Sequence, residues 1–248
     1  GTQMLLDLIA QCLPSPLDRG NKTGLNPKNG EETVRKPEDG EPLSAQVIKT
    51  VSDPYAGRLT IMRIFSGTLT ADSNFYNASK DVKERFGSLM LMQGKSQQTI
   101  KSAGRGQIVA VAKLKETLTG DTLCDPNNPI VYPVPETMNP IVSMAVQPKS
   151  KGDEDKIFSS LARLMEEDPT LQVHRETQTR ETILSGMGEI HIAASMGKLK
   201  RKFGVEVNLS PPKVPYRETI KKAVTGVIYR HKKQTGGRGQ FAEVHFDL

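Results

Sequence analysis

The predicted order of strands and helices between Pro140 and Leu209 constrains the fold of this chain more than any other feature. Alternation of apolar residues with a period of two predicts four short strands, and a period of 3.6 residues predicts two helices between them. The predicted strands cover residues 141–146, 171–173, 182–184 and 205–209. The resulting order is strand, helix, strand, strand, helix, strand, which is that of the ferredoxin-like α+β fold, and we assign residues 137–210 to this domain.

Apolar residues at helical spacing support both predicted helices. The first helix carries its apolar face at Ile157, Leu161, Leu164 and Met165. The second helix begins near Met187 and carries its apolar face at Ile192, Met196, Leu199 and Phe203. Gly204 follows at the position of a helix C-cap. RNA-recognition motifs share this fold but stack bases on aromatic residues, and residues 171–184 contain none, so RNA recognition through this sheet is disfavoured.

Residues 43–130 show the pattern of a small antiparallel β-barrel. Short runs rich in Val, Ile, Leu and Thr alternate with turn residues at close spacing, which favours a barrel over an open sheet. The clearest of these runs cover residues 45–51, 59–65 and 108–114. A basic turn between Lys80 and Arg85 has two interpretations, an RNA-facing loop or a solvated hairpin tip.

The remaining segments are shorter. The sequence of residues 1–16 predicts a short amphipathic helix. Prolines at its end stop the helix, because proline cannot donate the next backbone hydrogen bond. Residues 17–42 are rich in Gly, Pro, Asn, Lys and Glu, and we interpret them as an exposed linker or surface loop. Residues 211–248 predict two strands joined by a glycine-rich turn and are too few to bury a core of their own, which indicates the start of a truncated third unit.

The positive charge of the chain is concentrated near its end. The net charge is +6, and residues 195–248 contain twelve Lys and Arg against four Asp and Glu. A phosphate-facing surface and a solvated basic face both explain this asymmetry. Cys12 and Cys124 have no neighbours at ligand spacing and are interpreted as free thiols of a reducing cytoplasm. No apolar run is long enough to cross a bilayer, so we expect a cytoplasmic protein without membrane contact.

The sequence contains no recognisable catalytic set. It lacks the GxxxxGK[ST] loop of nucleotide-binding proteins and the guanine-reading Asn-Lys-x-Asp. Its four histidines lack metal-ligand spacing, so we expect no enzyme activity, metal or cofactor in this chain. His191 has two interpretations, a functional residue or a helix residue with a hydrogen-bond partner. Glu166, Glu167 and Asp168 are typical of an exposed helix end before Pro169.

Several motifs, in order along the chain, resemble elongation factor G, a translational GTPase. The motifs are DPYAGRL (53–59), TGDTLCD (119–125), EEDPTL (166–171), SGMGEIHI (185–192), KLKRKFGVEV (198–207), YRETI (216–220) and QTGGRGQF (234–241). The resemblance implies the end of a GTPase domain, the second-domain barrel, the ferredoxin-like third domain and the first strands of the fourth domain. The overall fold class is then multidomain α+β.

The resemblance also implies partners and site residues. The ribosome is the expected partner, through small-subunit ribosomal RNA and a small-subunit protein, together with the GTPase domain of the intact factor, which would bind GTP and Mg²⁺. The implied ribosome-facing and switch-facing residues are Gly186, Met187, Gly188, Glu189 and His191. Candidates for contacts with RNA phosphates are Lys80, Lys83, Arg85, Lys198, Arg201 and Lys202.

The expected function is ribosome binding in support of GTP-dependent translocation of tRNA and mRNA. One departure from the family pattern keeps alternatives open. Family members usually carry an acidic residue and then Asp-Arg after the histidine, whereas this chain reads Ile-Ala-Ala-Ser-Met-Gly-Lys from Ile192, with Gly197 inside the helix. A ribosomal protection or recycling paralogue is therefore one alternative, and a free-standing RNA-binding module is another.

Overall fold

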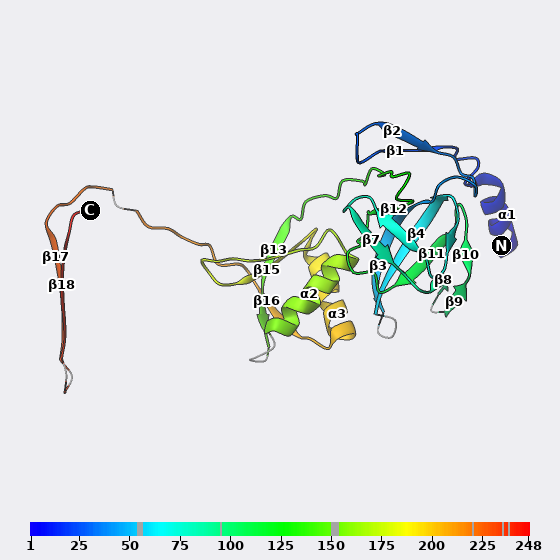
Figure 1. Ribbon diagram of the computed structural model, residues 1–248. Helices are drawn as coiled ribbons and strands as arrows, with labels where there is room; N and C mark the ends of the chain where they lie inside the picture. Colours follow the sequence, from blue (N-terminus) through cyan, green and yellow to red (C-terminus); the bar gives the residue numbers. More distant parts are fainter. Residues whose placement is uncertain (54–56, 95, 150–153, 220, 235, 238) are drawn as a thin grey trace. The chain divides into compact units, whose positions relative to one another are not determined.

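The structure is a computed structural model that describes residues 1–53, 57–94, 96–149, 154–219, 221–234, 236–237 and 239–248. These residues form two compact units, Gly1–Pro212 and Lys213–Leu248. The first unit contains a β-rich domain and a mixed α+β domain (Figure 1). None of the described helices is long and apolar enough to cross a membrane.

The β-rich domain is built on an eight-stranded antiparallel sheet in the order β7-β6-β12-β3-β4-β11-β8-β9. A separate two-stranded ladder joins β5 to β10. The strands are β3 (Ser44–Asp53), β4 (Gly57–Ser66), β5 (Leu69–Thr70), β6 (Asn74–Asn77), β7 (Val82–Arg85), β8 (Leu89–Gln93), β9 (Ser96–Ile100), β10 (Ser102–Ala103), β11 (Ile108–Ala112) and β12 (Thr122–Cys124). Among the described residues, β7 and β9 form the two edges of the large sheet.

One core holds these strands together, because apolar residues of nearly every strand pack into the same cluster. Met62 and Ile64 contribute from β4, Val109 and Val111 from β11, and all four are fully buried. These are alternate residues of β4 and of β11, which is the pattern expected of a sheet that curves around its interior. Gly67 closes the turn between β4 and β5 with φ of 72°, where a Cβ atom would lie 2.7 Å from main-chain atoms.

Residues 17–42 differ from the predicted linker. They contain an antiparallel hairpin of β1 (Lys22–Leu25) and β2 (Glu32–Arg35), drawn above the β-rich domain in Figure 1. Leu25 fixes the hairpin to the domain through two hydrogen bonds with Val131, at N···O distances of 2.9 and 2.7 Å. The apolar pattern did not predict the hairpin because its two buried residues are Gly24 and Arg35.

The expected turn at 80–85 is also shorter than predicted. Val82–Arg85 form β7, which pairs with β6 in register Asn74↔Arg85 to Asn77↔Val82. The turn itself lies just before this strand, where Asp81 adopts φ of 57°. Val82 and Glu84 of β7 are half-buried, so Lys83 and Arg85 lie on the other, exposed face of this edge strand.

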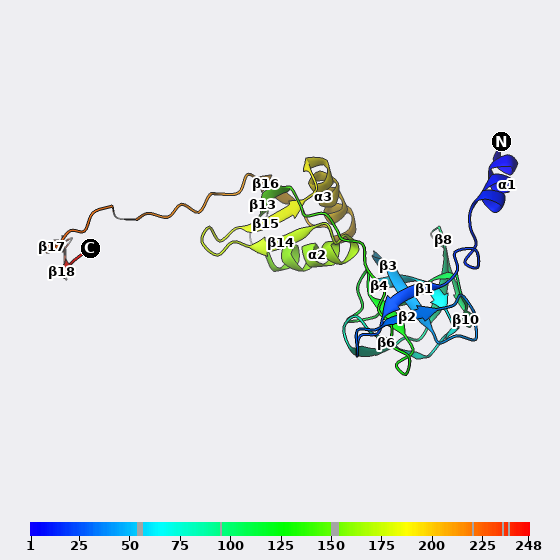
Figure 2. The ribbon, with the colours of Figure 1, turned by 90° about the horizontal axis from the view of Figure 1, so that it is seen from above.

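The α+β domain has the predicted ferredoxin-like order. Its elements are β13 (Val142–Pro148), α2 (Glu154–Glu167), β14 (Gln172–Arg175), β15 (Thr182–Gly186), α3 (Glu189–Phe203) and β16 (Val207–Ser210). The sheet is antiparallel throughout, in the order β14-β15-β13-β16, and both helices cover one of its faces (Figures 1 and 2). Leu161 and Leu164 of α2 and Ile192 and Leu199 of α3 meet in one core, as predicted.

The remaining elements are the N-terminal helix of the first unit and the hairpin of the second unit. Helix α1 (Thr2–Cys12) buries none of its residues, and Leu13 ends it in an extended conformation before Pro14. In the second unit, β17 (Val227–Lys233) and β18 (Gln240–Phe246) form an antiparallel hairpin. The described residues of this second unit contribute no buried hydrophobic side chain, in keeping with the expectation that so short a segment has no core of its own.

Candidate functional site

The segment between β15 and α3 carries the predicted ribosome-facing residues. Gly186 ends β15 and is buried, and a Cβ atom there would lie 3.1 Å from both His191 Nδ1 and Ile192 Cγ1. Glycine at 186 therefore lets the His191 ring pack against the end of the strand. Gly188 is the N-cap of α3, and its extended backbone, with nothing near a Cβ position, does not require glycine.

His191 is held by hydrogen bonds on both ring nitrogens. Its Nδ1 accepts from the Met187 amide at 3.1 Å, and its Nε2 lies 3.0 Å from Asp168 Oδ2. Because Nδ1 accepts, the neutral ring carries its proton on Nε2 and donates it to the carboxylate. His191 thus links the start of α3 to the residue that follows α2, which supports the interpretation of a helix residue with a hydrogen-bond partner.

Asp168 is organised as the acceptor for this histidine. Its Oδ1 accepts from the backbone amide of Thr170 at 3.1 Å and from the Thr170 hydroxyl at 2.5 Å. Partial burial opposes ionisation of Asp168, but the hydrogen bonds from Thr170 and His191 outweigh it and hold its pKa below the ordinary value. The carboxylate is therefore a fixed anion at neutral pH.

The side chains that this turn offers to a partner are Met187, Glu189 and Ile190. Glu189 is exposed in the first turn of α3, and Met187 is half-buried. Ile190 is 87% exposed although it is strongly apolar. Sequence reasoning missed Ile190, and the signal that could have found it is an isoleucine outside the apolar stripe of its helix.

The Glu166–Glu167 pair lies at a contact between the two domains of the first unit. Glu167 accepts a hydrogen bond from the Ser52 amide at 2.7 Å and forms an ion pair with Lys202 Nζ at 2.6 Å. Glu166 pairs more loosely with Arg58, at 3.5 Å between Oε2 and Nε. The acidic residues at the end of α2 therefore contact β3, β4 and α3. The expectation of an exposed helix end is wrong for Glu167 and Glu166.

The six candidates for phosphate contacts fall into two groups. Lys83, Arg85, Lys198 and Arg201 are exposed, and none forms an ion pair with a described residue. Lys80 instead pairs with Asp121 at 3.3 Å and donates to the Glu116 carbonyl, while Lys202 is engaged by Glu167. Only the first group is available for a partner without breaking an existing contact.

Two further predictions concern metal binding and the glycine-rich loop. Among the residues that the structure describes, no three His, Cys, Asp or Glu side chains form a group that could hold a metal ion. In the glycine-rich loop between β17 and β18, Gly236 and Gly237 adopt φ of 65° and 82°, which suits a turn, and Arg238 lies outside the described residues.

Comparison with known protein families covers most of the chain. The family model "Elongation factor G domain 2" matches residues 42–126, "Elongation Factor G, domain III" matches residues 137–211, and "Elongation factor G, domain IV" matches residues 212–248. The chain belongs to the elongation factor G family. The resemblance predicted from the motifs and the predicted fold class are both confirmed.

A solved structure extends this comparison. A crystal structure of a protein from Thermus thermophilus matches 99% of the chain at 34% sequence identity, with a TM-score of 0.73. The match covers 34% of that protein, so this elongation factor G chain spans about a third of its length.

Proposed function

We propose that this chain supplies ribosome-binding surfaces of an elongation factor G-type protein that promotes GTP-dependent translocation of tRNA and mRNA. The observation that carries the proposal is the turn before α3, where Met187, Glu189 and Ile190 are presented on a backbone fixed by His191. A partner that binds this turn meets a preformed surface, which lowers the entropic cost of association.

The two ends of α3 suit two different partners. The start of the helix offers an apolar side chain beside a carboxylate, which fits a protein surface such as the switch region of a GTPase domain. The end of the helix offers the exposed cations Lys198 and Arg201, which fit phosphates of ribosomal RNA. Lys83 and Arg85 on the edge strand β7 provide a second cationic pair of the same kind.

We propose that the chain itself neither binds nor hydrolyses GTP. The sequence contains no phosphate-cradling GxxxxGK[ST] loop, and nucleotide and Mg²⁺ would belong to the GTPase domain of the intact factor. Equilibrium dialysis with labelled GTP tests this statement, and saturable binding by the chain alone would contradict it.

Sedimentation with purified ribosomes across a salt series tests the main proposal. Loss of Lys198 and Arg201 together, in a Lys198→Ala/Arg201→Ala variant, should lower the slope of log affinity against log salt by about 1.4 to 1.8, since each phosphate contact contributes about 0.7 to 0.9. The matched control removes the exposed Lys28 and Lys36, which also lowers the net charge by two. Equal slopes in both variants would refute phosphate contacts by α3. If the chain shows no binding at low salt, the assay is repeated with the intact factor, and absence of binding there would refute the proposal.

A recycling or protection role is the second candidate, and the sequence from Ile192 to Lys198 is the observation that favours it. This stretch departs from the usual family pattern, although it folds into α3 without interruption at Gly197. Ribosome splitting and translocation assays with the intact factor distinguish the two roles. Tight binding to naked RNA, with no gain from assembled ribosomes, would instead indicate a free-standing RNA-binding module.

A further inference from the structure

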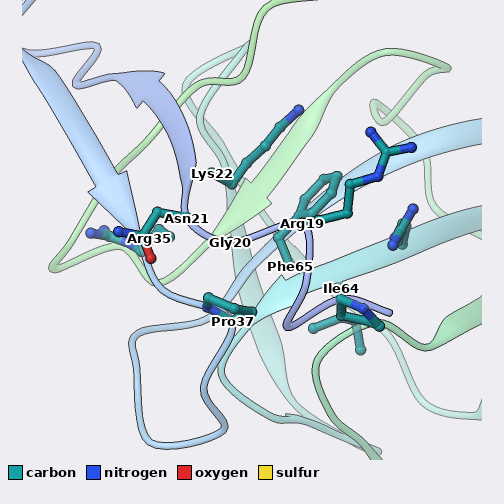
Figure 3. Close-up of a pocket in the computed structure, with 11 residues that line it drawn as sticks. Arg19, Gly20, Asn21, Lys22, Arg35, Pro37, Ile64 and Phe65 are labelled. Carbon is teal, nitrogen blue, oxygen red and sulfur yellow. The ribbon is translucent and has the colours of Figure 1, made fainter. Parts of the chain in front are cut away.

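A cavity of ≈ 360 Å³ opens between the hairpin β1-β2 and strand β4 of the β-rich domain (Figure 3). Its lining includes four cationic residues, Arg19, Lys22, Arg35 and Arg63, and none of the described residues that line it is acidic. Figure 3 shows Lys22 and Arg19 extending on one side of the chain at Gly20 and Asn21, and Arg35 on the other side. A cavity that is lined by cationic residues and by no described acidic residue favours an anionic ligand.

Arg35 is the most constrained of these cations. Its residue is only 7% exposed, and its Nη2 donates to the Asn128 carbonyl at 2.7 Å. Its Nε is buried and makes no hydrogen bond with a described residue, and no described carboxylate forms an ion pair with it. A buried guanidinium in this state lacks the counter-charge that normally accompanies burial of an ionised group.

Two of the other cations, Lys22 and Arg63, lie over aromatic rings. Lys22 Nζ lies 5.0 Å from the centre of the Phe65 ring and 5.6 Å from that of Tyr132, and the Arg63 guanidinium lies 5.6 Å from Phe65. Such contacts stabilise a cation without neutralising it. The Nε of Arg63 is also buried without a hydrogen-bond partner among the described residues.

The main chain fixes the shape of this cavity. The Leu25–Val131 hydrogen bonds hold the hairpin in place, and a Cβ atom at Gly24 would lie 2.6 Å from the Val131 carbonyl oxygen. On the opposite side, Gly106 has φ of 78°, and a Cβ atom there would overlap Pro16 Cγ. The walls therefore meet at close approaches of Gly24 to the Val131 main chain and of Gly106 to the Pro16 ring, which favours a preformed cavity.

We propose that this cavity, which we call the Arg35 pocket, binds the phosphate group of a small phosphate monoester. Guanidinium groups bind phosphate oxygens through paired, charge-assisted hydrogen bonds, and a dianion matches several cations better than a carboxylate does. The cavity is larger than one phosphate requires and falls in the size range of small-molecule sites. The face of Phe65 and the side chain of Ile64 supply an apolar wall for the organic part of the ester. The proposal is independent of ribosome binding.

Isothermal titration calorimetry of the full chain at low ionic strength, with inorganic phosphate and phenyl phosphate as separate probes, tests the proposal. Saturable binding at one site is expected, with phenyl phosphate the tighter probe because its ring meets the apolar wall. Arg35→Gln and Lys22→Gln should each weaken binding about tenfold or more, as expected for loss of one charge-assisted hydrogen bond. Lys28→Gln, an exposed lysine in the turn of the same hairpin, should leave the affinity unchanged.

Circular dichroism establishes that each variant is folded. If the buried Arg35 variant does not fold, Lys22→Gln and Arg63→Gln decide the question, because both residues are partly exposed. Absence of saturable binding, or equal loss of affinity in the Lys28 variant, would overturn the proposal. An oligonucleotide without terminal phosphates provides a third probe. If it binds more tightly than phenyl phosphate and loses affinity in the same variants, the pocket recognises nucleic-acid backbone and the small-ester assignment is wrong.

Discussion

Replacement of Glu167 should loosen the contact between the two domains of the first unit. Its carboxylate accepts from the Ser52 amide at 2.7 Å and contacts Lys202 Nζ at 2.6 and 2.8 Å, and its side chain is only 10% exposed. In Glu167→Ala the Ser52 amide loses its acceptor, and Lys202 keeps a longer hydrogen bond to the Ser52 carbonyl at 3.4 Å. Hydrogen bonds to a charged group contribute about 1.5–3 kcal/mol each. Discounting the part of Lys202 that reaches solvent, we expect a loss of about 2–4 kcal/mol in contact stability.

Hydrogen exchange at the Ser52 amide measures this loss directly. The contact should open more often in Glu167→Ala, so the amide should exchange at least about thirtyfold faster, which corresponds to about 2 kcal/mol. Glu167→Gln should show a smaller increase, because the amide oxygen still accepts from Ser52. Glu166→Gln is the matched control, since Glu166 makes only the looser contact with Arg58. Unchanged exchange at Ser52 in Glu167→Ala would refute the assignment of this carboxylate as the link.

Three further perturbations test the site and the core. Gly186→Ala should destabilise the α+β domain by about 1–3 kcal/mol in chemical denaturation, because its Cβ would crowd His191, whereas Gly188→Ala should be close to neutral. Asp168 has a folded pKa below its unfolded value of 3.8, so its contribution to stability is present above pH 3.8 and is lost as pH falls through the folded pKa. In thermal melts across a pH series, Asp168→Asn should therefore reduce the loss of stability at acid pH. Burial raises the pKa of Tyr132 to about 12, so stability should fall from pH 10 to 12, and tyrosinate absorbance should show one late-titrating residue that is absent in Tyr132→Phe.

The sequence predicted the α+β domain well because its elements bury regular apolar faces. Leu161, Leu164, Ile192 and Leu199 were all expected in the core, and all are buried there. The hairpin at residues 22–35 escaped prediction for the opposite reason. Its attachment rests on main-chain hydrogen bonds of Leu25 and on a buried arginine, neither of which produces a periodic apolar pattern.

The sequence placed the candidate residues at the start of a helix, but it could not show which residues they contact. The motifs placed His191 at the start of a helix, yet its partner Asp168 lies 23 residues away and meets it only through packing of α2 against α3. Likewise, a basic run cannot show which of its members already has a partner. Lys80 is paired with Asp121, which is remote in sequence, whereas nearby Lys83 is exposed without an ion pair to a described residue.

The neighbouring residues Glu167 and Asp168 contact both ends of α3. The EEDPTL motif at 166–171 therefore holds a helix that contains parts of two other motifs. Asp168 binds His191 in the first turn of the helix, and Glu167 binds Lys202 in its last turn. Glu167 also binds the Ser52 amide of β3. A partner that displaced the Met187–Ile190 turn would therefore have to break the His191–Asp168 hydrogen bond or carry the end of α2 with it. In the second case the displacement would reach β3 through the hydrogen bond between Glu167 and the Ser52 amide.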